Sequence, residues 1–426
     1  MILVGLEWKT RGSSGRHSLE RAEESLEELG ELASSAGGQV AGQIIQARIA
    51  PEAATLVGQG KVEEIAAAVH TSRADTVIFD QDLSPTQQRN LEKAIGSKVI
   101  DRTQLILDIF ASRAHTREGR LQVELAQLNY LLPRLAGHGT EMSRLGGGIG
   151  TRGPGETQLE TDRRRIARRI KKLEDELENV RAGRALHRRR RSAVPLATLA
   201  LAGYTNAGKS TLFNRLTQAG VLADARMFAT LDPTVRPLVL PSRRRVLVSD
   251  TVGFIRNLPT TVVKAFRATL EEVNEAALVL HVVDVSAPAA ADHTAHVRKV
   301  LAEIGAAEIP QLLVMNKVDR LPDGEGNFVA LRRRLLGASE VHGEANAVAV
   351  SALTGAGIDR LLGRIDEILP LDPIVRATVR LPVGDGASLA LLHEFGRVIE
   401  TRYDDQFCEV EAEIPESLRR RFTDLK

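Results

Sequence analysis

The chain has few of the residues that mark secreted, membrane-spanning or single-strand-binding proteins. It carries one cysteine, Cys408, among 426 residues, which excludes a disulfide framework. Aromatic residues make up 3% of the chain, so stacking platforms for single-stranded nucleic acid are not expected. No apolar run approaches the roughly 18 residues of a membrane span, and the segment from Met1 to Trp8 lacks the long apolar region of a signal peptide. We therefore expect a soluble, cytoplasmic protein.

Length and charge set the outer limits of the organisation. A chain of 426 residues is too long for one ordinary domain, and a formal net charge of +2 gives no overall attraction to nucleic acid. Four parts are expected: a small α/β domain (1–100), a helical hairpin with a basic linker (101–195), a doubly wound α/β domain (196–370) and a small C-terminal α/β domain (371–426). In the first part, Ser84 to Gln87 forms a capping box that predicts a helix ending near Ile95.

A glycine-rich turn carries the strongest functional signal. It follows the apolar run from Leu196 to Ala202, has the spacing of a P-loop and precedes a segment with helical character. Glycines let the backbone curl until its N–H groups point at phosphates, while Lys209 reaches the outer phosphates and Ser210 can ligate Mg²⁺. We expect a nucleoside triphosphate to be held by Gly203, Tyr204, Thr205, Asn206, Ala207, Gly208, Lys209, Ser210 and Thr211.

A carboxylate at the end of a second apolar run extends this site. The segment Asp250, Thr251, Val252, Gly253 lies where open α/β sheets hold their ligands. Asp250 is expected to reach Mg²⁺ through water, and the Gly253 N–H to contact the terminal phosphate.

A third segment selects the base. The run Asn316, Lys317, Val318, Asp319 ends another apolar strand, and a carboxylate there can accept two hydrogen bonds from guanine that adenine does not offer in that arrangement. The wrong base would leave that charge unsatisfied, so we expect GTP rather than ATP. The backbone of Ser351, Ala352 and Leu353 is expected to donate an N–H to the guanine O6.

Residues 101–195 have the pattern of two antiparallel helices. Apolar side chains recur at spacings of three and four, which gives each helix one seam. The seams are Leu121, Leu125, Leu128, Leu132 and Leu135 on the first helix, and Ile166, Ile170, Leu173, Leu177 and Val180 on the second. The glycine-rich connection between them carries Arg144 and Arg152. It is either a solvated loop or a backbone that approaches RNA phosphates closely.

The second helix and the segment after it concentrate positive charge that the overall balance conceals. Thirteen cations fall between residues 163 and 191. Such a run is commonly a solvated face, but its charge also suits structured RNA, which is recognised by shape and backbone. The candidate RNA contacts are Arg144, Arg152, Arg163, Arg164 and Arg168.

Taken together, these motifs resemble the HflX family of GTPases. The resemblance rests on the P-loop, the segments 228–233, 250–254 and 316–319, and upstream on 101–110, 122–128 and 146–164. It implies a ribosome-associated GTPase that binds the large ribosomal subunit, with members that split stalled or idle ribosomes under stress. In such a protein the hairpin and its glycine-rich loop reach toward the peptidyl-transferase region.

The resemblance also assigns a switch segment. It implies that Thr230 ligates Mg²⁺ and contacts the terminal phosphate, with Thr234 as the alternative. The nucleotide contacts it adds are Phe228, Ala229, Thr230, Leu231 and Asp232. Release of this segment after hydrolysis would convert phosphate chemistry into a change of shape.

The position after Gly253, where many GTPases carry a catalytic glutamine, is occupied by a different residue in this sequence. Phe254 stands where many GTPases place a glutamine that orients the attacking water, so slow intrinsic hydrolysis is expected. Asn206 is a candidate K⁺ ligand, because the P-loop form resembles GTPases in which that asparagine helps to hold a potassium ion. Activation by the ribosome is the alternative, and the two are compatible.

Two other functions remain open at this point. The same parts could form an NTP-driven enzyme that remodels RNA outside the ribosome, although helicase motifs are missing from the sequence. They could also form a GTP-dependent switch whose partner is a protein, with the basic run as a solvated face. A monomer is expected, because it suits a protein that fits between ribosomal subunits.

Overall fold

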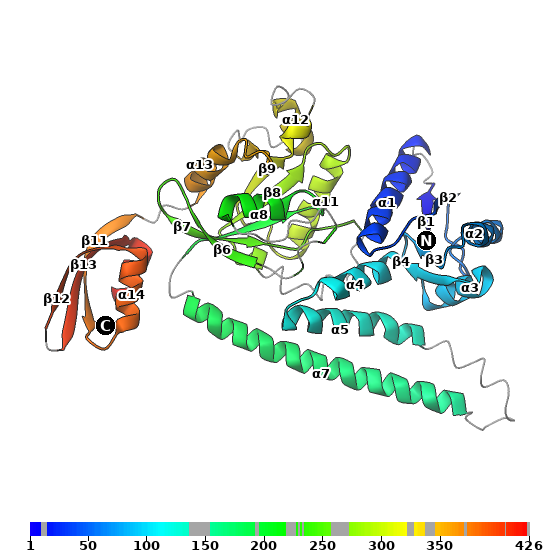
Figure 1. Ribbon diagram of the computed structural model, residues 1–426, viewed down its shortest axis with the longest axis horizontal. Coiled ribbons are helices and arrows are strands. Elements are labelled where there is room, and N and C mark those ends of the chain that lie inside the picture. The colour runs from blue at the N-terminus through cyan, green and yellow to red at the C-terminus, as the bar shows by residue number, and fades with distance from the viewer. Residues whose placement is uncertain are drawn as a thin grey trace.

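The protein is described from a computed structural model that covers residues 1–9, 15–135, 154–191, 196–218, 227–228, 231, 234–256, 272–321, 328–336, 346–369, 373–404 and 406–423. Four units follow one another along the chain (Figure 1). The predicted fold class, a multidomain α/β protein with a P-loop GTPase sheet, is confirmed. Within the described part of the chain, no helix is long and apolar enough to cross a membrane.

The N-terminal unit is a four-stranded parallel sheet in the order β2-β1-β3-β4. Alternate strand residues point to opposite faces, so each face has its own core. Leu3 and Ile78 pack with helix α1, while Val4 and Phe79 pack with α2 and α3. The capping box at Ser84 is present and the helix ends at Ile95, as predicted. The elements are β1 (Ile2–Trp8), α1 (Gly15–Ser35), β2 (Gly42–Arg48), α2 (Gln59–Ser72), β3 (Thr76–Phe79), α3 (Pro85–Ile95) and β4 (Lys98–Asp101).

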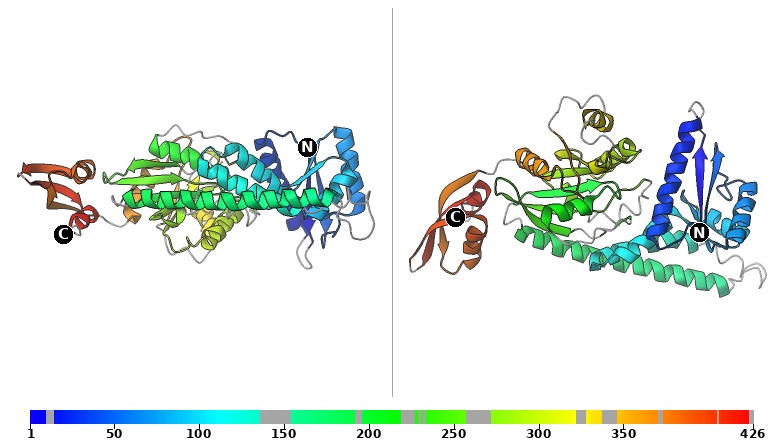
Figure 2. Two further views of the ribbon diagram at one scale, coloured as in Figure 1. Left: turned by 90° about the horizontal axis from the view of Figure 1, so that it is seen from below. Right: turned by 45° about the horizontal axis from the view of Figure 1, so that its top comes forward.

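Three helices connect this unit to the next. They are α4 (Arg102–Arg113), α5 (Arg117–Arg134) and the long α7 (Pro154–Arg191), which runs beside α5 and beneath the central sheet (Figures 1 and 2). Leu121 packs against Leu173 and Leu177, with Leu125, Leu128 and Val180 around them, so the predicted seam forms in its central part. Helix α4 was not distinguished as a separate element from the sequence.

The central unit is a six-stranded sheet in the order β10-β9-β8-β5-β7-β6, parallel except for β6. Strand β6, the antiparallel one, begins at Thr234. The strands are β5 (Thr198–Gly203), β6 (Thr234–Val239), β7 (Arg245–Asp250), β8 (Leu278–Asp284), β9 (Gln311–Asn316) and β10 (Ala347–Ala349). The described helices are α8 (Lys209–Thr217), α11 (Ala290–Glu303), α12 (Phe328–Leu336) and α13 (Ile358–Ile368).

The C-terminal unit is a three-stranded antiparallel sheet in the order β11-β13-β12 with two helices. It lies at the end of the molecule away from the N-terminal unit (Figure 2). Cys408 is buried in its core. The elements are β11 (Ile374–Pro382), α14 (Gly386–Phe395), β12 (Arg397–Tyr403), β13 (Phe407–Pro415) and α15 (Glu416–Thr423).

Candidate nucleotide site

The P-loop joins the end of β5 to the start of α8, and two of its glycines cannot be replaced without strain. Gly203 has φ +159°, and a Cβ there would lie 2.3 Å from the carbonyl oxygen of Val282 on β8. Gly208 has φ +91°, and its Cβ would lie 2.3 Å from the side-chain nitrogen of Asn316. The loop is therefore pressed against two neighbouring strands, and α8 begins directly behind it, which points backbone N–H groups at a phosphate position.

Lys209 lies at the centre of this loop. Its side chain is buried, and Nζ donates to the carbonyl oxygens of Gly203 at 3.0 Å and Tyr204 at 2.8 Å. Burial lowers the pKa of Lys209 to about 8, against an opposing effect of the Asp250 carboxylate. An ammonium group that is short of compensating charge is well suited to bind a phosphate.

Ser210 and Asp250 form the oxygen pair expected for Mg²⁺. The Ser210 hydroxyl donates to Asp250 Oδ2 at 2.8 Å, and the Asp250 carboxylate is completely buried at the end of β7. Magnesium in phosphate sites is commonly bound by one or two protein oxygens, phosphate oxygens and water, and this pair fits that pattern. Thr251 has a different use: its hydroxyl donates to the Leu201 carbonyl oxygen at 2.5 Å, which ties β7 to β5.

The segment after Asp250 is attached to the P-loop through its backbone. The N–H of Thr205 donates to the Phe254 carbonyl oxygen at 2.7 Å, and the Phe254 N–H donates to the Gly203 carbonyl oxygen at 3.1 Å. Gly253 lies above the lysine, since a Cβ there would be 3.0 Å from Lys209 Nζ. The Phe254 side chain is buried in the core, so it cannot contact an attacking water.

Asn316 joins the P-loop to the expected base-binding loop. Its Nδ2 donates to the Ala207 carbonyl oxygen at 2.9 Å, and its Oδ1 accepts from the Ala352 N–H at 3.0 Å. Asp319 is exposed beyond the end of β9, where a base has access to it. The loop 351–353 combines a buried Ser351 and Ala352 with an exposed Leu353. These segments therefore converge on one side of the P-loop.

Two residues that support this site, Asp284 and Arg215, were not predicted from the sequence. Lys317 forms an ion pair of 2.7 Å with Asp284 at the end of β8. Arg215 on α8 donates to the carbonyl oxygens of Ala352 and Leu353 and so anchors the expected base-binding loop. Asp284 was recognisable as a carboxylate at a strand end, but Arg215 lies on a helix with no local signal for this role.

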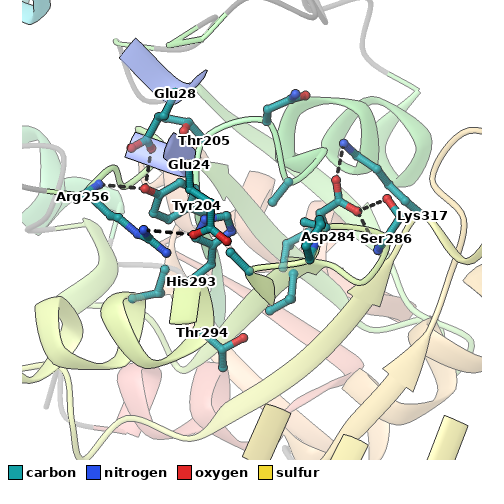
Figure 3. A pocket seen from close by; sticks show the side chains of 18 of the residues that line it. Glu24, Glu28, Tyr204, Thr205, Arg256, Asp284, Ser286, His293, Thr294 and Lys317 are labelled. Carbon is teal, nitrogen blue, oxygen red and sulfur yellow. Dashed lines mark hydrogen bonds and ion pairs between the residues drawn. The ribbon is translucent and has the colours of Figure 1, made fainter. Parts of the chain in front are cut away.

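A cavity of about 390 Å³ lies beside the P-loop, between the central sheet and α1 (Figure 3). Four glutamates of α1 line one wall, and Tyr204, Thr205 and Asn206 line the other. Asp319 and Ser351 are not among its lining residues, so the cavity borders the expected base position without including it. Asn206 is exposed, with a left-handed φ of +58°.

The remaining site residues are exposed on α7, buried in the core or outside the described residues. Arg163, Arg164 and Arg168 are exposed on α7. Phe228 and Leu231 are buried in the core, with the Phe228 ring 4.6 Å from that of Phe110 on α4. The predicted site residues Arg144, Arg152, Ala229, Thr230 and Asp232 lie outside the described residues.

Comparison with known proteins gives three family matches in sequence along the chain. Residues 23–111 match the family described as GTP-binding GTPase N-terminal, residues 113–191 match GTP-binding GTPase Middle Region, and residues 198–317 match 50S ribosome-binding GTPase. Together these matches cover more than half of the chain, from α1 to the end of β9.

Individual relatives are similar over nearly the whole chain. The GTPase HflX of Caldanaerobacter subterraneus subsp. tengcongensis is 46% identical over 94% of this chain and 89% of its own length. The GTPase HflX of Escherichia coli K12 is 48% identical over 85% of this chain and 83% of its own length. A solved GTP-binding protein from Sulfolobus solfataricus in complex with GDP has a TM-score of 0.45 and 24% identity, covering 86% of this chain and 98% of that one.

Proposed function

Since this chain belongs to the HflX family of GTPases, we propose that it couples GTP hydrolysis to work on the large ribosomal subunit, splitting or rescuing stalled ribosomes under stress. GTP is its substrate, and the matched domains are those of a GTP-hydrolysing enzyme. The ribosomal part of the proposal rests on one observation, the basic surface of α7.

Helix α7 carries a row of cations whose side chains face solvent. Arg163, Arg168, Lys171 and Lys172 are exposed, on the part of the helix that runs beside α5. Arg169 differs from them, because it forms a two-pronged pair with Glu124 on α5 with both distances at 2.7 Å. One arginine thus fixes α7 to α5 while its neighbours remain available to phosphates. This arrangement supports RNA as the ligand of the exposed row.

In this proposal the switch is formed by the nucleotide loops, which are the P-loop (203–211), the segments 228–232, 250–254 and 316–319, and the loop 351–353. Ser210, Asp250 and Thr230 would hold Mg²⁺, which neutralises charge on the phosphates when it is bound. Lys209 and the N–H of Gly253 would contact the terminal phosphate, and Asp319 would read guanine. Hydrolysis removes the group that Gly253 and Thr230 contact, so both segments are released and the affinity for the subunit changes.

Since Phe254 is buried, another group must assist hydrolysis. We propose the large subunit as the main activator, with K⁺ at Asn206 as a second contribution. GTP turnover measured with and without large subunits, in K⁺ and in Na⁺, separates the two. An unchanged rate under all four conditions would refute both.

Co-sedimentation tests the ribosomal assignment. Binding to large subunits is expected with a nonhydrolysable GTP analogue and should weaken with GDP. Binding only to protein-free RNA would favour the RNA-remodelling enzyme, and binding to neither would favour a protein-partner switch. Either outcome would overturn the proposal.

Variants on α7 test its basic surface. Replacing Arg163, Arg168 and Lys172 with alanine should weaken subunit binding at least tenfold and reduce the dependence of log affinity on log salt concentration by roughly one per lost phosphate contact. The matched control removes acids from the same helix. Glu174→Gln with Asp175→Asn changes two exposed charges and should leave binding equal or stronger. Equal losses in both variants would mean that the helix is merely damaged.

A further inference from the structure

Tyr204, the second residue of the P-loop, has a side chain that points toward Glu28 of the N-terminal unit (Figure 3). Its hydroxyl donates to the carboxylate of Glu28 on α1, although 176 positions separate the two residues in sequence. The same hydroxyl accepts the backbone N–H of Arg256 at 2.9 Å. One oxygen atom therefore links the P-loop, the segment after Asp250 and the N-terminal unit.

The acceptor on α1 is itself held rigidly. The second oxygen of Glu28 pairs with the Arg102 guanidinium at 2.6 Å, and Arg102 also pairs with Asp80 at 2.7 Å. The Arg102 side chain is almost completely buried, and Ser25 donates to the other oxygen of Asp80 at 2.7 Å. A carboxylate fixed by such a network presents its remaining oxygen in one orientation, so it can position the group that it binds.

The aromatic ring of Tyr204 is fixed as well. It stacks on the imidazole of His293 on α11, with ring centroids 3.8 Å apart and planes 9° from parallel. Burial lowers the pKa of His293 to about 4, so the stacked imidazole is neutral near pH 7. The Tyr204 side chain is 6% exposed. Ring and hydroxyl are thus held from three elements at once.

We propose that Tyr204 is a positioning residue of the GTPase site, which holds the phosphate-contacting segment from Asp250 to Arg256 in place by tying it to Glu28 of the N-terminal unit. The hydroxyl acts three residues beyond Gly253, on the same short segment whose backbone bonds to Gly203 and Thr205. Both hydrogen-bond partners of the hydroxyl are protein groups. The inference rests on the GTPase activity and is independent of the ribosome.

The arrangement predicts which kinetic constant changes. Tyr204→Phe removes the hydroxyl and keeps the ring on His293, so only the attachment of the segment is lost. Because GDP lacks the terminal phosphate that this segment contacts, GDP affinity should stay within about twofold. The single-turnover rate of GTP hydrolysis should fall about ten- to hundredfold, the range expected for one hydrogen bond to a charged group.

Glu28 provides the reciprocal test. Glu28→Ala should lower the rate as Tyr204→Phe does, and the double variant should be no slower than the worse single variant, because both substitutions break one link. Glu28→Gln, which keeps an oxygen acceptor for the tyrosine, should recover most of the lost rate. Since Glu28→Ala also leaves Arg102 with one partner fewer, its folding is checked by thermal unfolding alongside.

A second buried tyrosine is the matched control. Tyr130 is 7% exposed and donates to the Asp101 carboxylate at 2.9 Å, but it lies on α5 and its partner is at the end of β4, not on the nucleotide segments. Tyr130→Phe should lower the unfolding temperature comparably and leave the hydrolysis rate unchanged. The proposal is overturned if Tyr204→Phe hydrolyses GTP at the wild-type rate or faster, if GDP affinity falls in parallel, if the Glu28 and Tyr204 effects multiply, or if Tyr130→Phe slows hydrolysis equally.

Discussion

Asn316 offers the sharpest test of how the nucleotide loops are held together. Its amide is 1% exposed and serves two loops, as donor to Ala207 in the P-loop and acceptor from Ala352 in the expected base-binding loop. Asn316→Ala removes this partner from two buried groups, the Ala207 carbonyl oxygen and the Ala352 N–H. Each such group costs about 1–3 kcal/mol when left unsatisfied, so the loss totals roughly 2–6 kcal/mol.

Part of this loss should appear as weaker nucleotide binding, because both loops must be in place to enclose a nucleotide. If about 1.4 kcal/mol of the lost stabilisation is expressed as weaker binding, nucleotide affinity falls tenfold. GTP and GDP should be affected equally, since neither loop contact involves the terminal phosphate. Equilibrium titration with fluorescent GDP and with a nonhydrolysable GTP analogue measures both constants.

Two further variants make the interpretation specific. Asn316→Asp keeps the acceptor for Ala352 but places an oxygen opposite the Ala207 carbonyl, so it should bind no better than the alanine variant. Asn274→Ala is the control, because Asn274 also donates to a carbonyl, that of Ile304 at 2.8 Å, but on the exposed surface of the same unit. A loss below twofold in Asn316→Ala, or a loss for GTP alone, would refute the reasoning.

Three other predictions follow from single contacts. Gly203→Ala forces a Cβ into the Val282 carbonyl oxygen, 2.3 Å away, so the unfolding temperature should fall and GDP binding should weaken; wild-type values for both would contradict the geometry. The pKa of Lys209 is about 8 before nucleotide binds, and the negative charge of a bound phosphate should raise it. Near pH 8.5, nucleotide binding should therefore be accompanied by uptake of a proton at Lys209. Affinity should then fall by up to about tenfold per pH unit above 8, and calorimetry in buffers of different ionisation enthalpy should detect uptake at pH 8.5 but little at pH 6.5. Leu173→Ala in the hairpin seam removes a fully buried side chain and should destabilise by about 2–5 kcal/mol, whereas Leu131→Ala, at 41% exposed, should change unfolding far less.

The local motifs could be predicted because each lies within a few residues of a strand end. Lys209, Ser210 and the glycines beside them are adjacent in sequence, and chain geometry alone brings them round one phosphate position. Asp250 and Asn316 follow apolar runs, and the carboxyl ends of parallel strands meet at one edge of a sheet. The hairpin could be predicted for a similar reason, since its seam repeats at helical spacing.

The contacts across units could not be predicted in this way. Arg102 reads as an ordinary charged residue before a helix, yet it is buried between Asp80 and Glu28. Glu28 lies in a row of glutamates that is typical of a solvated helix face, and nothing local distinguishes the one that meets Tyr204. Arg215 likewise reaches the base-binding loop 137 positions away.

The sequence by itself determined the nucleotide loops, the expected preference for guanine and the absence of a glutamine after Gly253, because these depend on residue type at fixed spacing. Only the tertiary structure decided that Phe254 is a core residue, that Asn316 joins two loops, and that Tyr204 connects the P-loop to the N-terminal unit. The physical reason is the same in each case. A side chain's partner is chosen by the packing of units against each other, and a pattern within one segment carries no information about what will lie opposite it.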